Sequence, residues 1–167
     1  TARYLAPKTI GVVGMIGTGV QARYQLQYLK YVVYCRSCLL LLWGRTPEHV
    51  VSVQRELEQE GVWTNVKVAS SPQDLLEQCD LIVTTTTARE PILMQGKKRK
   101  KPQHITCIGA DAPGKMELDP AIVAESDLLV CDSKSQTQER GEFQECLRQN
   151  TVQIKDIVEL GELIQNR

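Results

Sequence analysis

The sequence predicts an α/β fold in which helices cover both sides of a doubly wound, parallel sheet of six strands. Three observations support this fold class. Short apolar runs, which suit strands buried on both faces, alternate along the chain with apolar stripes at helical spacing. A glycine-rich turn follows the first apolar run and precedes the first stripe. The length of 167 residues suits one domain, so we expect residues 1–167 to form a single domain.

The first strand and the turn after it carry the strongest signal. Apolar residues 10–13 lead into the sequence Gly-Thr-Gly-Val-Gln-Ala at residues 17–22, where the first helical stripe begins. A strand, this glycine turn and a helix form the dinucleotide-binding fingerprint of Rossmann folds, because the turn lets backbone amides approach a pyrophosphate. A glycine-rich turn without a ligand is the alternative. The candidate phosphate-binding residues are Gly17, Thr18, Gly19, Val20 and Gln21.

The later elements follow the same alternation. Residues 39–43 are apolar throughout and predict the second strand, and Thr46-Pro47 starts a helix that ends at Gly61. Ser71 is followed by a proline and by Asp74, a combination typical of a capped helix start. Further strands are predicted at residues 66–69, 80–85, 104–108 and 127–131, with a helix start at Asp119-Pro120. Beyond residue 133 the pattern predicts helix to the end of the chain.

The residues after the second strand bear on which dinucleotide binds. NAD-binding versions of this fold place an acid near the end of that strand, where it bonds the ribose 2′-hydroxyl. Here the strand is followed by Gly44, Arg45 and Thr46, with no acid before Glu48. An arginine can form a forked, charge-assisted contact with a 2′-phosphate, so the sequence favours NADP(H) and leaves NAD(H) as the alternative. The competing interpretation makes Arg45 an exposed loop cation.

Two further polar segments follow predicted strands. Thr84, Thr85 and Thr86 follow the fourth strand, where hydroxyl groups can reach ribose or nicotinamide amide groups, although threonine runs also simply favour strands. Gly109 and Asp111 follow the fifth strand, in a glycine- and proline-shaped loop at the same predicted sheet edge. The Asp111 carboxylate would lie where a nicotinamide ring binds. Taken alone, it could equally bond its own backbone in a turn.

Together these motifs resemble the ornithine cyclodeaminase/mu-crystallin family. The resemblance rests on the turn at residues 17–22 with its Gln-Ala ending, and on residues 4–6, 90–93 and 159–162. Its most specific part is the string Gly-Ala-Asp-x-Pro-Gly-Lys-x-Glu-Leu at residues 109–118. The matches run in family order along almost the full chain.

The resemblance implies an NAD(P)-binding Rossmann domain whose partner domain, which binds substrate and forms a homodimer, lies outside this chain. Such a chain should bind cofactor and not turn over substrate alone. In cyclodeaminases and the related alanine dehydrogenases, the aspartate that matches Asp111 acts on the substrate amine or the attacking water, so Asp111 is the candidate catalytic residue. The implied reaction moves a hydride from Cα of a small amino acid (ornithine, lysine or alanine) and leaves an imine.

The mu-crystallin branch of the family offers a different function. It resembles an NADPH-dependent reductase of cyclic ketimines, or an NADPH-regulated binder of a hydrophobic hormone, and its loop lacks the aspartate. The sequence Gly44-Arg45-Thr46 is similar to that branch, whereas Asp111 is similar to the cyclodeaminase and dehydrogenase branch. We give Asp111 more weight, because a carboxylate at the reacting centre bears directly on the chemistry.

Composition argues against several other classes of function. Basic and acidic residues number 20 each, and the net charge of zero disfavours a nucleic-acid or membrane-surface partner. The basic run Lys97 to Lys101 is interpreted as a solvated loop, because no aromatic side chains interleave for base stacking. Six cysteines lie mostly in or beside apolar runs, which favours reduced thiols in a cytoplasmic protein. The lone Cys35-x-x-Cys38 lacks a second ligand pair, so no metal site is expected.

Overall fold

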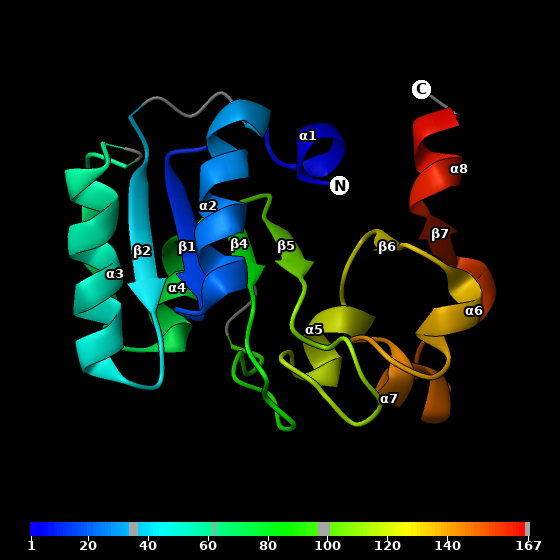
Figure 1. Ribbon diagram of the computed structural model, residues 1–167. Helices are drawn as coiled ribbons and strands as arrows, with labels where there is room; N and C mark the ends of the chain where they lie inside the picture. Colours follow the sequence, from blue (N-terminus) through cyan, green and yellow to red (C-terminus); the bar gives the residue numbers. More distant parts are fainter. Residues whose placement is uncertain (34–36, 62, 97–100, 166–167) are drawn as a thin grey trace. The chain divides into compact units, whose positions relative to one another are not determined.

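A computed structural model describes residues 1–33, 37–61, 63–96 and 101–165 of the chain (Figure 1). The chain divides into two compact units. We call residues 2–86 and 96–108 the sheet unit, and residues 1, 87–95 and 109–167 the C-terminal unit. Each unit is described by itself.

A parallel sheet of five strands forms the centre of the sheet unit, in the order β3-β2-β1-β4-β5. The chain starts at the middle strand, moves outward to one edge, and returns to build the other side, which is the doubly wound topology that the sequence predicts. Within the sheet, Ile16 lies beside Trp43 on one side and Thr84 on the other. The strands are β1 (Val12–Ile16), β2 (Leu39–Trp43), β3 (Val66–Val68), β4 (Leu81–Thr84) and β5 (His104–Cys107).

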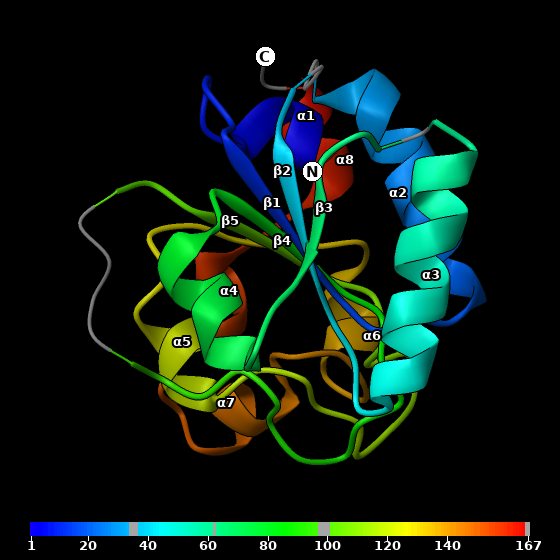
Figure 2. The same cartoon turned by 90° about the vertical axis from the view of Figure 1, so that its left-hand side faces the viewer.

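Helices cover both faces of this sheet, with α2 and α3 on one face and α4 on the other (Figure 2). The helix α4 begins where the sequence predicts, because the Ser71 side chain accepts from the Asp74 amide and Asp74 bonds back to Ser71. The Asp74 pKa is lowered by hydrogen bonds from Ser70 and Ser71. The helices of the sheet unit are α1 (Ala2–Leu5), α2 (Val20–Val32), α3 (Pro47–Gln59) and α4 (Pro72–Gln78).

The core between the sheet and α2 and α3 uses the predicted apolar stripes. Met15 and Leu42 of the strands pack in one cluster with Leu26 of α2 and Val53 of α3, and all four are almost fully buried. Burial of such a side chain stabilises the fold by about 1.5–3 kcal/mol. On the opposite face, a Cβ at Gly14 would lie 2.8 Å from Cys79 Sγ, so α4 packs against backbone there.

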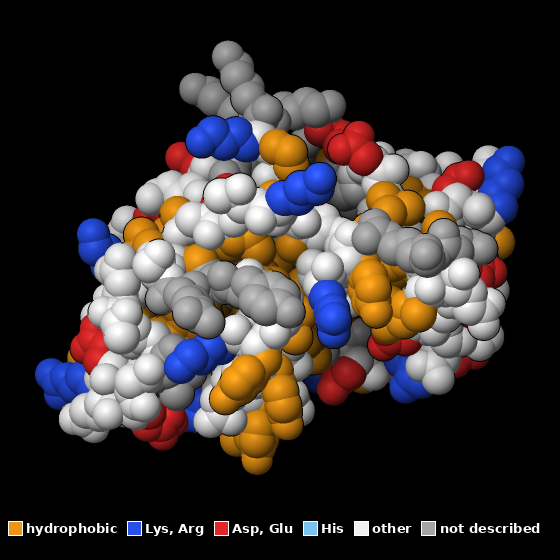
Figure 3. Space-filling view, turned by 90° about the horizontal axis from the view of Figure 1, so that it is seen from above, with side chains coloured by type: hydrophobic (Ala, Val, Ile, Leu, Met, Phe, Trp, Pro, Cys, Tyr) orange, Lys and Arg blue, Asp and Glu red, His pale blue; other side chains and the backbone are white. Residues whose placement is uncertain are grey.

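The outer face of α2 carries three exposed tyrosines. Ala22, Leu26 and Leu29 face the core, as the stripe predicts. Hydrophobic side chains reach the molecular surface in several places on the face drawn in Figure 3. On α2, the exposed large hydrophobic side chains are Val20, Tyr24, Tyr28 and Tyr31.

The C-terminal unit contains a second sheet, which corrects the prediction of a six-stranded sheet. The sixth predicted strand forms as β6 (Leu129–Cys131), but it pairs in parallel with β7 (Ile157–Glu159). The expectation of helix throughout the last segment is therefore also wrong. A three-residue apolar run indicates a strand, but nothing local to it specifies which strand will be its partner. The helices here are α5 (Pro120–Ala124), α6 (Lys134–Thr137), α7 (Gln144–Arg148) and α8 (Leu160–Gln165), with a 3₁₀ turn, η1 (Ile154–Asp156).

The expectation of reduced thiols holds for part of the chain. Cys79, Cys131 and Cys146 are free and buried, and Cys107 is free. Cys38 is disulfide-bonded, so the expectation is wrong for this residue, because apolar surroundings do not show whether a second sulfur is within reach. Cys35 and most of the basic run Lys97 to Lys101 lie outside the described residues.

Among the residues that are described, no helix has the length and apolar composition of a membrane span. Within the same residues, no group of acidic, histidine and cysteine side chains is clustered as metal ligands would be.

Candidate functional site

The turn after β1 requires glycine at its first position. Gly17 has a φ of +112°, and a Cβ there would lie 2.5 Å from Thr85 Oγ1. Its amide donates to the Trp43 carbonyl at 2.9 Å, which holds the turn against the end of β2. The conformation that the fingerprint demands of Gly17 is therefore present.

The residues after Gly17 leave the start of α2 open. Gly19 is the N-cap residue and has an extended conformation. The space beside it is open, because a Cβ at this position would meet nothing within 4 Å among the described residues. As a glycine, the N-cap residue has no side chain with which to cap the first-turn amides of α2. Val20 and Gln21 are exposed there. Unpaired amides at the positive end of a helix suit an anion such as a pyrophosphate.

The end of β2 packs directly on this turn. A Cβ at Gly44 would lie 2.9 Å from Thr18 Cγ2, so the absence of a side chain at Gly44 lets the turn approach. Arg45 is exposed, and Thr46 begins α3 without a capping bond from its side chain. The Arg45 guanidinium forms no ion pair with a carboxylate of the described residues, and a guanidinium of this kind can contact a 2′-phosphate.

The threonines after β4 play different parts. Thr84 is fully buried as the last residue of its strand. Thr85 donates its amide to the Ile16 carbonyl at 2.9 Å, and its hydroxyl donates to the same oxygen at 3.3 Å. Thr86 is half-buried. Thr85 thus joins β4 to the start of the glycine turn, which is a structural role that the sequence interpretation did not assign.

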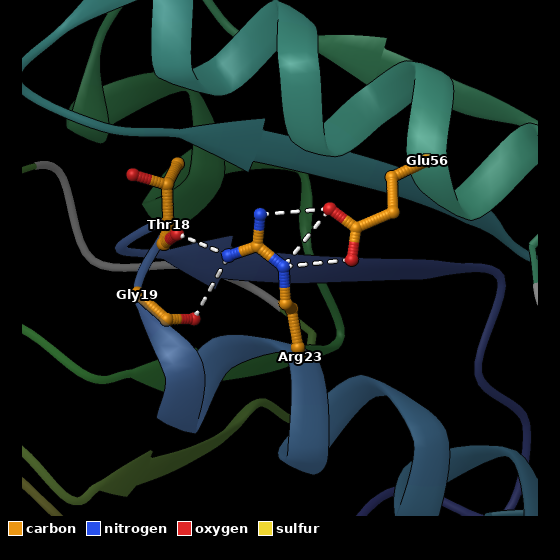
Figure 4. Close-up of polar contacts among 4 residues, drawn as sticks. All are labelled: Thr18, Gly19, Arg23 and Glu56. Atoms are coloured by element: carbon orange, nitrogen blue, oxygen red, sulfur yellow. Dashed lines mark hydrogen bonds and ion pairs between the residues drawn. The ribbon is translucent and has the colours of Figure 1, made fainter.

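An arginine that sequence analysis missed ties this turn to α3 (Figure 4). The Arg23 guanidinium donates to the Thr18 carbonyl at 2.8 Å and to the Gly19 carbonyl at 3.4 Å. Its other two nitrogens bind both carboxylate oxygens of Glu56 at 2.7–2.9 Å. This hydrogen-bonded pair raises the pKa of Arg23 and lowers the pKa of Glu56. The pair joins residues 33 positions apart, so no local pattern indicates it.

The loop of residues 109–118, in the C-terminal unit, is held by two buried glutamates. Glu117 is fully buried and accepts from the Gly109 amide at 2.8 Å. Glu142 accepts from the amides of Glu117 and Leu118, at 2.9 Å each for the shorter contacts. Burial raises the pKa of Glu142 to about 7, and the charge of Glu117 adds to the rise, while the two amides oppose it. Glu117 belongs to the string at residues 109–118, whereas Glu142 has no motif around it, and sequence analysis missed it.

The candidate catalytic carboxylate lies at the surface of this loop. The side chain of Asp111 is 69% exposed and forms an ion pair with Lys115, four residues further along the chain. The hydrogen bond from Lys115 lowers the Asp111 pKa. A carboxyl in a closed, dry site would have a raised pKa, so the shift in this chain runs in the opposite direction.

A hollow in the sheet unit lies along one of its helices. It has a volume of about 720 Å³ and follows the outer face of α3. Its lining includes Glu48, Glu56 and Glu60 with one arginine, Arg55. Glu56 is already paired with Arg23, and the two remaining carboxylates outnumber Arg55, so the charge of this hollow does not favour a phosphate-bearing ligand.

The sheet order explains which predicted site residues come together. The segments after β1, β2 and β4 meet because those strands are neighbours and their carboxyl ends share one edge. This edge carries Gly17, Thr18, Gly19, Val20, Gln21, Arg45, Thr46, Thr84, Thr85 and Thr86. Gly109 and Asp111 belong to the C-terminal unit.

Comparison with known proteins decides the family. The model of the ornithine cyclodeaminase/mu-crystallin family matches residues 1–167, the whole chain. The chain belongs to this family. Among curated members, it is 33% identical over 165 residues to an uncharacterized cyclodeaminase of Sinorhizobium fredii, and 32% identical over 165 residues to an alanine dehydrogenase of Archaeoglobus fulgidus. Both matches cover 98% of this chain and 48% of the relative, so the chain spans about half the length of these family members.

A solved structure from the family has the same fold. The iminosuccinate reductase of Paracoccus denitrificans, determined in complex with NAD⁺, matches with a TM-score of 0.86 and 31% identity. The match covers 99% of this chain and 49% of that protein. The α/β Rossmann architecture predicted from sequence is confirmed, with five strands in the main sheet instead of six.

Proposed function

We propose that this chain is the nicotinamide-cofactor-binding part of an amino-acid oxidoreductase or deaminase of the ornithine cyclodeaminase type. The observation that carries the proposal is the turn at residues 17–19, whose conformation and open approach suit a pyrophosphate. The NAD⁺ in the related iminosuccinate reductase supports the same ligand class. Amides at the start of α2 would hold the pyrophosphate, and Arg45 and Thr46 would bind the adenosine ribose.

Arg45 leads us to propose NADP(H) over NAD(H). The residue is exposed after β2, and the described structure shows no ion pair that would occupy its guanidinium. A 2′-phosphate would supply the missing acceptor, and Arg is suited to phosphate by its planar fork of donors. The relative solved with NAD⁺ makes NAD(H) the alternative that the experiment below must distinguish.

We assign the proton-transfer role to Asp111. When bound, a nicotinamide would accept a hydride from the amino-acid Cα. The protein would position the substrate and transfer protons to and from the reacting nitrogen. The Asp111 carboxylate is exposed to a ligand, and its ion pair with Lys115 favours the ionised form, which can accept a proton. Lys115 and the buried Glu117 hold the loop in which Asp111 lies.

The substrate we propose is a small amino acid or its cyclic imine, in a cytoplasmic homodimer formed through a part of the protein outside this chain. Ketimine reduction, or the binding of a hydrophobic hormone under NADPH control, is the second candidate. The sequence Gly44-Arg45-Thr46 favours it, and the presence of Asp111 favours the first.

A paired fluorescence titration of the chain with NADPH and NADH tests the cofactor proposal. We expect tighter binding of NADPH, and we expect Arg45→Asp to shift the preference toward NADH by about tenfold or more, because hydrogen bonds to charged groups contribute about 1.5–3 kcal/mol. Arg55→Asp, an equal charge change at another exposed arginine, is the matched control. Tighter NADH binding by the wild type would overturn the role of Arg45, and binding of neither cofactor would overturn the cofactor-binding function.

A further inference from the structure

We propose that Arg23 is a positioning residue, held by Glu56, that orients the amides of the glycine turn toward a bound pyrophosphate. The inference rests on the proposed cofactor function and adds a part of the binding site outside the fingerprint. Its basis is the set of contacts in Figure 4, in which one guanidinium reaches both the turn and α3.

The Arg23 side chain divides its donors between two tasks. Nε and Nη2 bind the Glu56 carboxylate in a fork, which is the strong, geometrically specific form of this ion pair. Nη1 remains for the turn, where it donates to the carbonyl of Thr18 at 2.8 Å and to the carbonyl of Gly19 at 3.4 Å. Side chains in a helix lean toward its N-terminus, so an arginine at the fourth position of α2 can reach back to these carbonyls.

Fixing a carbonyl also fixes the next amide. A peptide bond is planar and trans, so the C=O of Thr18 and the N–H of Gly19 point in opposite directions. When Arg23 holds the Thr18 carbonyl, the Gly19 amide is directed away from Arg23. The bond to the Gly19 carbonyl constrains the Val20 amide in the same way. These amides belong to the turn that would cradle a pyrophosphate, and orienting donors before binding lowers the cost of binding.

The positioning role of Arg23 depends on Glu56, because an unpaired arginine side chain rotates freely and carries an uncompensated charge. The two side chains are about one-third exposed, 34% and 33%, so water competes for the guanidinium. The carboxylate fork restricts the rotation of a long side chain whose free rotamers would release the turn. Because Glu56 lies on α3, the pair also joins this helix to the turn, beside the contact of Thr18 with Gly44.

A positioning role has a signature that differs from a charge effect. If Arg23 acts by orienting amides, removing Glu56 loosens it and weakens binding. If Arg23 acts by attracting phosphate with its charge, removing the carboxylate leaves a stronger net positive field and tightens binding. The glycine turn would bind the pyrophosphate that both cofactors share, so loosening the turn weakens the affinity for NADPH and NADH equally. A change at Arg45 would instead alter the preference between them.

The test is a titration of the chain and its variants Arg23→Gln, Arg23→Lys and Glu56→Gln with NADPH and NADH. We expect the dissociation constants of both cofactors to rise together, about three- to tenfold for either Arg23 variant and about threefold for Glu56→Gln. Arg55→Gln and Glu58→Gln, which remove exposed charges of the same signs from α3, should leave affinity unchanged. Thermal unfolding curves of the wild type and each variant identify a temperature for the titrations at which all of these proteins are folded.

Each result has a definite meaning. Unchanged affinity in Arg23→Gln, wild-type affinity in Arg23→Lys, or tighter binding in Glu56→Gln would overturn the positioning role. If Arg23→Gln does not fold, the sign of the change in Glu56→Gln still decides between orientation and charge. A wild-type chain that binds neither cofactor contradicts the proposed function itself, before any variant is compared. Unchanged variants of a binding wild type contradict only the role of Arg23.

Discussion

Replacing Glu142 by glutamine should alter how the stability of the chain depends on pH. Glu142 is 8% exposed and has a pKa of about 7, against a usual value of 4.5. Between these values the folded state binds more protons than the unfolded state, so the free energy of unfolding falls as the pH rises. The destabilisation begins near pH 4.5 and is complete above about pH 7. Glutamine has nearly the same shape and does not titrate, so it should remove this dependence.

The magnitude follows from the size of the pKa shift. Each pKa unit corresponds to about 1.36 kcal/mol, so a rise from 4.5 to about 7 costs the ionised form about 3 kcal/mol. Part of this cost is already present at pH 5, which leaves about 2.5 kcal/mol between pH 5 and pH 8. One oxygen of Glu142 lies 3.1 Å and 2.9 Å from the amides of Glu117 and Leu118, so a glutamine carbonyl can keep both bonds. Any cost of placing the amide nitrogen would be the same at both pH values.

The assay is urea unfolding at pH 5, 6, 7 and 8 at constant ionic strength. Between pH 5 and pH 8, the wild type should lose about 2.5 kcal/mol more unfolding free energy than Glu142→Gln. Glu145→Gln is the matched control, because the hydrogen bond from Arg148 lowers the Glu145 pKa and keeps its titration below this range. Parallel pH profiles for the wild type and Glu142→Gln would show that Glu142 is ionised at pH 5 in the folded chain, and would refute the argument from burial.

Further substitutions test the glycine turn and the proposed role of Asp111. Gly17→Ala should lower the free energy of unfolding by about 1–3 kcal/mol, since φ is +112° and the new Cβ would lie 2.5 Å from Thr85 Oγ1. Gly19→Ala, at a position with open space, should be near neutral in the same urea experiment, and equal losses would contradict the turn geometry. In the full-length protein, Asp111→Asn should abolish turnover and leave NADPH affinity nearly unchanged. Retained turnover would favour the ketimine-reductase or hormone-binding function.

Local patterns predicted most elements of the sheet unit. The apolar run at residues 39–43 became β2 with the expected bounds, and Ser71 with Asp74 formed the capping box that starts α4. The first strand is Val12–Ile16 and not residues 10–13, because the apolar residues flanking Gly14 extend the strand up to the turn. Such boundaries depend on pairing with β2 and β4, which a single segment does not specify.

The sequence by itself determined the chemistry of the fingerprint turn, the helix starts and the family of the chain. Each of these depends on residues close together in sequence, where glycine conformation, capping and apolar spacing act directly. Only the tertiary structure decided that β6 pairs with β7, that Arg23 meets Glu56, and that Glu142 holds the loop of Asp111. These contacts join residues 24 to 33 positions apart, and they exist because folding makes distant elements neighbours and removes water from between them.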